Sequence, residues 1–264
     1  MRGGSQSHLM RCSDGHHYVV KFPNNQQGRR VLANELLGAS LADFLSLPVA
    51  QGAVVWVEDA LVEISEELII GTKLNSTRCE PGRCFGSRFA VDPRIKAAFD
   101  IFPGSLLKQV ENLQDFFGMF VFDVWTSNLD SRQVVFVKEK PNAYRAVMID
   151  QGLCFGGATW QMGDCPLKCA YLDKRVYKDV QGVVDFEPWL TILEEAINRD
   201  VLDAVAGAIP PEWYGSDRAS LDLLLEGLLR RKDAVRNKIE IFASTFAEMF
   251  PSWKSRAFGA CGGQ

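Results

Sequence analysis

Histidine is scarce in this chain of 264 residues, and its placement limits the available chemistry. All three histidines lie within the first seventeen residues, so they are not expected to be catalytic. The seven cysteines also lack the paired two-residue spacing of a zinc ribbon, because Cys79 and Cys84 enclose four residues and Cys165 and Cys169 enclose three. We therefore expect free thiols in a reduced compartment rather than a structural zinc ion.

Long apolar runs and an excess of basic charge are also missing. No run approaches the roughly 18–20 residues that span a bilayer, and the first residues lack the apolar core of a secretory signal. These absences lead us to expect a cytoplasmic protein without a membrane span. The net charge of −4 gives no reason to expect direct nucleic-acid binding. With 47% hydrophobic residues, the chain can bury the core of one large or two small domains.

The first part of the chain is predicted to be rich in strands, with a single helix. A hairpin is expected over residues 9–22, and apolar residues at every third or fourth position predict a helix from Arg29 to the exit at Pro48. Further predicted strands cover residues 53–57, 60–64 and 84–90, and loop composition dominates residues 71–86. A boundary near residues 88–93 then divides the chain into predicted domains 1–90 and 91–264.

The second part is predicted to be mainly helical. Its broad apolar stripe indicates a buried helix within residues 104–127, and two apolar strands follow. Later segments are expected to form a long loop, a helix broken near Arg199 and a long amphipathic helix from Ser216 or Asp217. In order, these predicted segments are strands 134–137 and 144–149, loop 160–181, and helices 187–203 and 217–246.

Two carboxylates are placed at the ends of predicted rigid elements. Asp130 lies in a polar loop after the buried helix, and Asp150 ends the second apolar strand. Such a pair suits phosphoryl transfer, in which one carboxylate orients the acceptor hydroxyl and another holds the metal on the nucleotide phosphates. Two ordinary turn aspartates in a surface loop are the alternative.

Two charged residues in the first part are compatible with the same chemistry. Lys21 lies in a strand of large apolar residues, where its ammonium group either contacts phosphates in a cleft or extends to solvent at a sheet edge. Glu35, on the predicted helix, can anchor that lysine as an ion pair, or be a solvated helix charge. Gly4, Ser5 and Gln6 are compatible with a phosphate-binding loop or with a frayed terminus.

These segments together resemble the stand-alone HipA-like kinase family of bacteria. The resemblance rests on residues 18–22, 28–35, 85–89, 123–133 and 148–152, and it extends over roughly residues 3–189. It implies an α+β, bilobal protein-kinase-like fold that binds ATP and Mg²⁺ between a small β-rich lobe and a mainly helical lobe.

The resemblance also implies a role for individual residues. Lys21 would contact the phosphates with Glu35 as its partner, Asp130 would be the catalytic aspartate, and Asp150 would bind the metal. Gly4, Ser5 and Gln6 would belong to the phosphate loop, and Phe85 and Gly86 would line the adenine side.

One departure from the family concerns the metal. The family places a metal-binding asparagine five residues after the catalytic aspartate, where this chain has Val135, which cannot coordinate a metal. Gln133 or Asn128 is the candidate replacement ligand. Arg132 is a candidate for steadying the transferring phosphate or pairing with Asp150, and the alternative is a structural tie to a backbone carbonyl.

A second departure concerns length. The chain is shorter than HipA, and we expect it to have no counterpart of the N-terminal extension of HipA, so toxin activity and pairing with a DNA-binding antitoxin are not expected to carry over.

Three functions remain open from the sequence. The first is an ATP-dependent kinase whose acceptor is a hydroxyl, preferably of Ser or Thr on a protein. The second is a kinase for a lipid or another small hydroxyl compound. The third is a nucleotide-binding pseudokinase that acts as an interaction module, which Val135 favours and the retained Lys21, Glu35, Asp130 and Asp150 oppose. The oligomeric state is not readable from the sequence.

Overall fold

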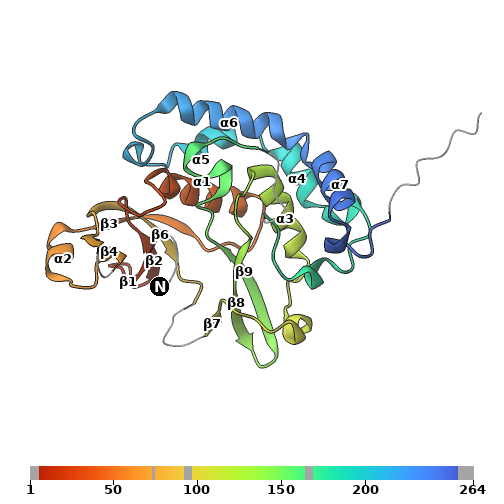
Figure 1. Cartoon of the computed structure of the whole chain (residues 1–264), viewed down its shortest axis with the longest axis horizontal. Helices are drawn as coiled ribbons and strands as arrows, with labels where there is room; N and C mark the ends of the chain where they lie inside the picture. The colour runs from red at the N-terminus through yellow and green to blue at the C-terminus, as the bar shows by residue number, and fades with distance from the viewer. Residues whose placement is uncertain (1–5, 73–74, 92–96, 164–168, 255–264) are drawn as a thin grey trace, which may run out of the picture.

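The computed structural model describes residues 6–72, 75–91, 97–163 and 169–254. Figure 1 shows a β-rich lobe beside a larger lobe, in which helices pack around one end of a long β-hairpin. The predicted α+β, bilobal fold class is thereby confirmed. The domain bounds 1–90 and 91–264 stay a prediction.

The smaller lobe is built on a four-stranded antiparallel sheet with strand order β1-β2-β6-β3. One face of this sheet packs on a small apolar cluster that includes Val20, Phe22 and Val62. The strands are β1 (His8–Arg11), β2 (His17–Lys21), β3 (Gly52–Val57) and β6 (Gly82–Arg88). A separate two-stranded ribbon is formed by β4 (Ile69–Thr72) and β5 (Asn75–Arg78).

Two predictions in this lobe are wrong. Residues 60–64 belong to the helix α2 (Asp59–Ile64), because one apolar side chain, Val62, suffices to dock this short segment and Asp59 favours a helix N-terminus. The predicted loop 71–86 contains β5 and most of β6. The four residues of β5 are all exposed and polar, so the strand carries no alternating apolar signal and is held by pairing with β4.

The helix α1 (Arg30–Phe44) follows the prediction, but it packs mainly on the larger core. Leu32, Leu36 and Leu37 join the apolar cluster that also contains Phe120 and Trp125. This placement puts α1 between the small sheet and the helices of the larger lobe (Figure 1). Residues on α1 can therefore reach both sides of the gap between the lobes.

The predicted helix over 104–127 is two elements, the 3-10 helix η1 (Gly104–Gln109) and α3 (Asp115–Thr126). Between them, the Asn112 side chain donates to Asp115 and to the Ala146 carbonyl and accepts from the Ala146 N–H. Bonds of this kind compete with helix hydrogen bonds, which explains the interruption. The largely buried α3 delivers the chain to residue 128 as expected.

A three-stranded antiparallel sheet carries the two predicted apolar strands. Its order is β7-β8-β9, with β7 (Ala98–Phe99), β8 (Gln133–Lys140) and β9 (Ala143–Ile149). The register pairs Gln133 with Ile149, so the residues that begin β8 and those that follow β9 lie at the same end of the sheet. This register brings the segments that carry Asp130 and Asp150 to the same edge.

The last third of the chain is helical. The break predicted near Arg199 is confirmed, because α4 (Trp189–Ala196) ends before α5 (Arg199–Ala206), whose N-cap Asn198 accepts from the Val201 N–H. The predicted single helix 217–246 is α6 (Arg218–Lys232) and α7 (Val235–Thr245), which both pack on α3. Within the described ranges, further 3-10 helices are η2 (Cys154–Thr159), η4 (Lys174–Tyr177), η5 (Val183–Phe186), η6 (Pro211–Tyr214) and η7 (Ala247–Met249).

The cysteines depart in part from the expected free thiols. Cys12, Cys79, Cys84 and Cys154 are free, whereas Cys169 is disulfide-bonded. Among the described residues, no group of three or more His, Cys, Asp or Glu side chains is arranged to hold a metal ion. No helix in the described ranges is long and apolar enough to cross a membrane.

Candidate active site

The strand lysine and the helix glutamate form a buried ion pair, as predicted. Lys21 ends β2, and its Nζ contacts Glu35 on α1 and the Asp150 carboxylate at 2.8 Å. The side chains of Lys21 and Glu35 are almost fully buried, whereas that of Asp150 is 33% exposed. One cation is thus shared by two carboxylates, of which Asp150 is the more exposed.

Burial and charge act in opposite directions on these three groups. Burial alone would lower the pKa of Lys21, but the two carboxylates outweigh it and raise that pKa, so the lysine stays cationic. Burial raises the pKa of Glu35 to about 7 against the attraction of Lys21. Burial acts in the same sense on Asp150, but Lys21 outweighs it and the pKa of Asp150 is lowered. Asp150 is therefore the carboxylate that stays ionised at neutral pH.

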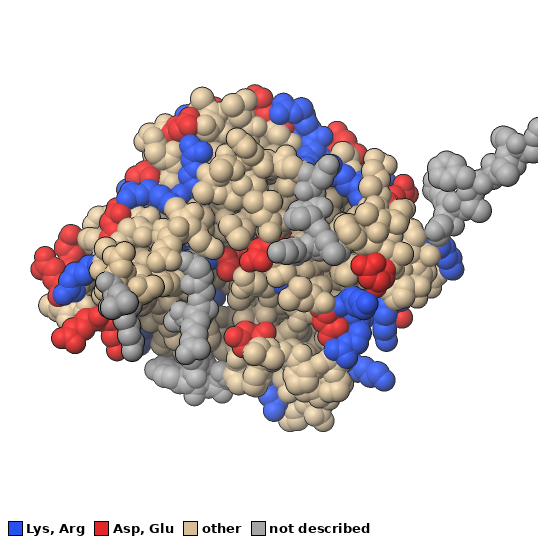
Figure 2. All heavy atoms as spheres, in the orientation of Figure 1, with Lys and Arg blue, Asp and Glu red and all other residues tan. Residues whose placement is uncertain are grey.

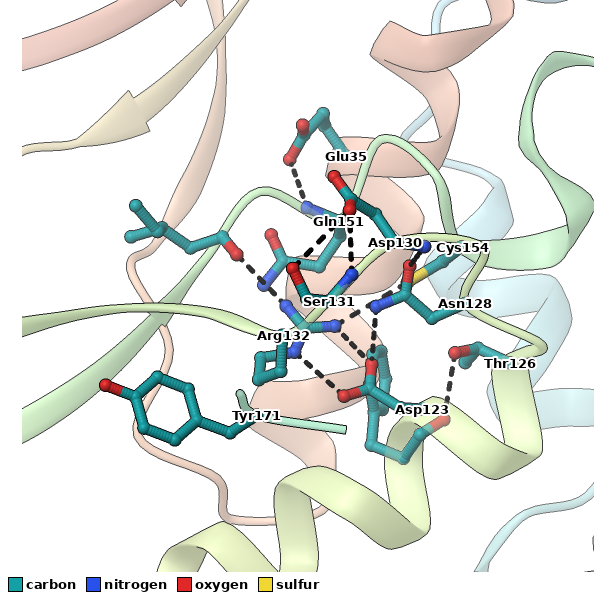
Figure 3. Close-up of polar contacts among 12 residues, drawn as sticks. Glu35, Asp123, Thr126, Asn128, Asp130, Ser131, Arg132, Gln151, Cys154 and Tyr171 are labelled. Atoms are coloured by element: carbon teal, nitrogen blue, oxygen red, sulfur yellow. Dashed lines mark hydrogen bonds and ion pairs between the residues drawn. The ribbon is translucent and has the colours of Figure 1, made fainter. Parts of the chain in front are cut away.

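The loop that carries Asp130 is held by the buried Asp123. The Arg132 guanidinium donates to both Asp123 oxygens, from Nε at 3.0 Å and from Nη2, and Asn128 Nδ2 donates to Asp123 Oδ1 at 2.9 Å (Figure 3). Burial raises the pKa of Asp123, while Arg132 and Asn128 favour its ionised form. The chain turns here because Ser127 ends α3 in the left-handed conformation.

Arg132 also connects the two acid-bearing segments. Its Nη1 donates to the Ile149 carbonyl at 3.0 Å, directly before Asp150. The Leu129 N–H donates to the Leu153 carbonyl at 3.0 Å on the far side of the same junction. The geometry therefore favours the alternative of a structural tie for Arg132, since its side chain is 1% exposed and its donors are directed at Asp123 and at Ile149.

A cavity of about 320 Å³ separates the small sheet from the acid-bearing loops. This volume falls at the lower end of the range for small-molecule pockets. Acidic atoms lie at the hollow between the two lobes in Figure 2. The residues around it include Lys21, Glu35, Phe85, Asp130, Gln133, Val135 and Asp150.

The structure separates the candidate metal ligands. Gln133 and Val135 both border the cavity, whereas Asn128 is buried beneath the loop. Asn128 donates to Asp123 and accepts from the Asp130 N–H at 3.2 Å, so both ends of its amide are engaged. Of the two replacements considered for the missing asparagine, Gln133 is the one that faces the cavity.

Among the residues predicted at the phosphate loop and the adenine side, some border the cavity and others do not. Gly4 and Ser5 lie outside the described residues. The Gln6 side-chain amide binds the backbone of Gly71: its Nε2 donates to the Gly71 carbonyl, and its Oε1 accepts from the Gly71 N–H. Phe85 borders the cavity, whereas Gly86 is packed within the sheet, where a Cβ atom would lie 2.5 Å from Val55.

Two buried polar residues that hold the site were assigned no role in the sequence analysis. Asp123 lies in the apolar run of α3, and Asn34 lies next to Glu35 on the buried face of α1. A polar side chain within an apolar helical stripe is a signal, because burial without hydrogen-bond partners is costly. The sequence alone does not show which loop such a side chain meets.

The donor set fits a divalent cation held together with a nucleotide. Magnesium typically takes one or two carboxylates and completes its shell with water and substrate phosphates. Asp150 presents a partly exposed, ionised carboxylate to the cavity, and Gln133 presents an amide at its border. Kinases typically use ATP and such a metal, and the residues present are compatible with both.

A strand lysine paired with a helix glutamate, opposite two loop aspartates between two lobes, defines a protein-kinase-like phosphotransferase. The sequence comparison agrees with this class, since the HipA-like kinase family matches residues 1–238. The chain belongs to the HipA-like kinase family and is a kinase.

Solved structures show the same fold in distant proteins. The Golgi casein kinase superposes with a TM-score of 0.51 at 14% identity, over 93% of this chain and 73% of its own. Hydra Fam20, determined with sugar, superposes with a TM-score of 0.53 at 12% identity, over 91% of this chain and 84% of its own. No curated protein sequence matches the chain.

Proposed function

We propose that this kinase transfers the γ-phosphoryl group of ATP, with Mg²⁺, to a Ser or Thr hydroxyl of a protein. The observation that carries the proposal is the contact of Lys21 with both Glu35 and Asp150 at the wall of a cavity that Asp130 also borders. The residues proposed as the phosphate-binding cation, the metal ligand and the proton acceptor therefore border one cavity, as phosphoryl transfer requires.

Lys21 and Glu35 form the phosphate-binding side of the site. The ammonium of Lys21 is held by Glu35, whose second oxygen accepts from the Gln151 N–H at 2.9 Å. Because Glu35 is fixed at both oxygens, the ammonium group of Lys21 stays anchored on that side when the nucleotide phosphates bind. When phosphates bind, Lys21 exchanges part of its contact with Asp150 for the phosphate oxygens.

Asp150 and Gln133 are the proposed ligands of the metal. The metal supplies neutralisation of the charge on the transferring phosphate when it is bound. Release of Asp150 from Lys21 leaves its carboxylate available for that cation. Gln133 begins β8 directly across the sheet from Ile149, so its amide starts from the same edge as Asp150.

Asp130 is the proposed acceptor of the proton from the acceptor hydroxyl. Its carboxylate borders the cavity, and its backbone is fixed by Asn128 and by the turn in which Ser131 N–H donates to Asp130 Oδ1 at 2.8 Å. A base held in this way orients the hydroxyl toward the phosphorus. Arg132 is proposed as a positioning residue that links this loop to the end of β9.

A protein acceptor is proposed from the likeness of fold to the Golgi casein kinase. A small-molecule hydroxyl is the competing acceptor, and the experiment below separates the two.

The test is incubation of the purified protein with γ-labelled ATP and Mg²⁺, alone and with a cell lysate. The Asp130→Ala variant is expected to lose transfer by about a hundredfold or more while it keeps nucleotide binding. Asp179→Ala is the matched control, because that side chain is 81% exposed and lies outside the cavity lining. Label on phosphoserine or phosphothreonine after acid hydrolysis supports the protein acceptor.

Three outcomes would overturn parts of the proposal. Label that partitions into organic solvent or stays on a small compound replaces the protein acceptor with a lipid or small-molecule hydroxyl. Nucleotide binding without transfer by the unmodified protein points to the interaction module that Val135 favours. Unchanged transfer in Asp130→Ala shows that the base is assigned to the wrong residue.

A further inference from the structure

One stripe of α1 holds the loop that follows Asp150. Arg30, Asn34 and Gly38 are spaced by four residues and so lie along one face of the helix. All three contact residues between positions 151 and 160. This contact is separate from the Glu35 pair with Lys21.

Asn34 makes four contacts with this loop and is fully buried. Its Nδ2 lies 2.9 Å from the Gly152 carbonyl oxygen, 3.2 Å from that of Cys154 and 3.1 Å from that of Gly157. Its Oδ1 accepts from Trp160 Nε1 at 2.7 Å. A single amide therefore binds the loop at four points spread over nine residues.

The loop has an unfavourable backbone that needs such support. Three non-glycine residues have φ values in the left-handed region, namely Asp150 at 59°, Phe155 at 62° and Trp160 at 57°. Gly156 and Gly157 also have positive φ, at 77° and 68°. A run of such conformations persists only where surrounding contacts determine it, and it is often found at functional sites.

Arg30 and Gly38, one turn before and one turn after Asn34 on α1, extend the contact with the loop in both directions. The Arg30 guanidinium lies 4.7 Å from the centre of the Trp160 ring and pairs with Asp217 at 3.1 Å. At the other end, a Cβ on Gly38 would lie 2.6 Å from that of Gln151. The loop is therefore packed against α1 along its whole length.

Packing of the loop sets the place of Asp150. Gly152 has no room for a side chain, since a Cβ there would lie 2.6 Å from Val31 and 2.9 Å from Glu35 Oε1. The carbonyl of Gly152 is also the first of the three that Asn34 binds. Between this anchor and the end of β9 only Asp150 and Gln151 remain, so their backbone has little freedom.

We propose that Asn34 is a positioning residue for the kinase reaction, which binds loop 152–160 to α1 and so holds the Asp150 carboxylate where it receives the metal. The inference rests on the proposed role of Asp150. It assigns Asn34 no contact with nucleotide, metal or acceptor.

The experiment compares Asn34→Ala with Asn112→Ala in the full chain. Asn112 is a matched control, because its amide also bridges backbone groups, those of Ala146, but it does not contact loop 152–160. Two quantities are measured: amide hydrogen exchange over residues 151–160 without ligands, and the Mg²⁺ concentration that half-saturates binding of a non-hydrolysable ATP analogue.

Asn34→Ala is expected to accelerate exchange in residues 151–160 and to raise the half-saturating Mg²⁺ concentration by about tenfold. Asn112→Ala is expected to change neither quantity. Trp160→Phe serves if Asn34→Ala does not fold, because it removes one N–H donor and keeps the ring beside Arg30. A smaller change in the same direction is expected for it.

Unchanged Mg²⁺ dependence in a folded Asn34→Ala protein whose loop exchanges faster would overturn the proposal, since the loop would then not position Asp150. Equal changes in Asn112→Ala would also overturn it, because the effect would be general destabilisation. Neither measurement requires phosphoryl transfer. Failure of the proposed kinase reaction, seen as no label transfer by the unmodified protein, is thus distinguishable from failure of this inference.

Discussion

The two acid-bearing loops are held by different kinds of buried group. The loop of Asp130 is organised by the Asp123 carboxylate, which pairs with Arg132 and accepts from Asn128. The loop after Asp150 is organised by the neutral amide of Asn34. Removal of one partner of a buried charge pair leaves the other charge uncompensated, whereas removal of a buried amide leaves only neutral groups without a hydrogen bond, which costs less free energy.

The two supports also come from different parts of the molecule. Asp123 lies on α3 in the larger lobe. The Asp130 loop follows α3 and belongs to the same lobe. Asn34 lies on α1, the helix that also carries the partner of Lys21. We infer that Asp130 is fixed within one lobe, whereas the position of Asp150 depends on the position of α1. The predictions below test this contrast.

The largest effect is expected for the acid of the second loop. Asp150→Ala removes the proposed metal ligand and is expected to abolish Mg²⁺-dependent nucleotide binding, a loss of about a hundredfold or more in affinity. Isothermal titration with and without Mg²⁺ measures this loss. Asp130→Ala should bind normally in the same titration, and equal losses in both variants would erase the division of roles between the loops.

The next effect concerns the charged support of the first loop. Asp123→Ala leaves the buried Arg132 guanidinium without its carboxylate and is expected to lower the free energy of unfolding by about 3–5 kcal/mol. Urea denaturation followed by circular dichroism gives this value. Asp130→Ala, in the same loop but at the cavity, should cost less than about 1 kcal/mol. A loss of similar size in the two variants would show that Asp123 does not organise the loop.

A smaller effect is expected at the edge shared by the loops. Gln133→Ala should raise the Mg²⁺ concentration for half-maximal activity by about tenfold, because it removes the proposed amide ligand. Val135→Asn added to that variant should recover part of the loss, since it supplies an oxygen to the same cavity. No response in either variant would leave Asp150 as the single protein ligand of the metal.

The smallest effect is a pH dependence of stability that arises from Glu35. This residue lies on α1 and accepts a hydrogen bond from Gln151 N–H, directly after Asp150. Burial raises the folded-state pKa of Glu35 to about 7, well above the ordinary value of a glutamate side chain. The folded protein therefore holds a proton that the unfolded chain has released, and stability falls as the pH rises through 7. Between pH 6 and 8 the expected loss is about 1.4 kcal/mol.

Thermal unfolding at pH 6 and 8 measures this loss, beside the Glu35→Gln variant. The variant has no carboxyl group to titrate at this position, so its stability should change less over the same interval. A wild-type protein whose stability rises with pH over this window would show that the sign is wrong and that the ion pair with Lys21 governs Glu35.

Much of the architecture was readable from local patterns. The density and spacing of apolar residues located α1, the buried α3 and the strands β8 and β9, because each of these elements packs apolar side chains into the core. Residues 60–64 and the polar strand β5 were predicted wrongly, since a short helix with one buried side chain and an exposed ribbon leave almost no apolar pattern. The break between α6 and α7 was missed because the apolar spacing continues across it.

The sequence by itself determined the chemical inventory: a strand lysine, a helix glutamate, two aspartates after rigid elements, and a valine where the family places a metal ligand. Residue types and short spacings carry this information because they determine the local strand, helix or loop in which each residue lies. Only the tertiary structure decided that Arg132 and Asn128 lie beneath the loop and Gln133 beside the cavity. It also brought Asn34 to a loop more than a hundred residues away. Such contacts depend on how α1 packs between the lobes, which no local pattern encodes.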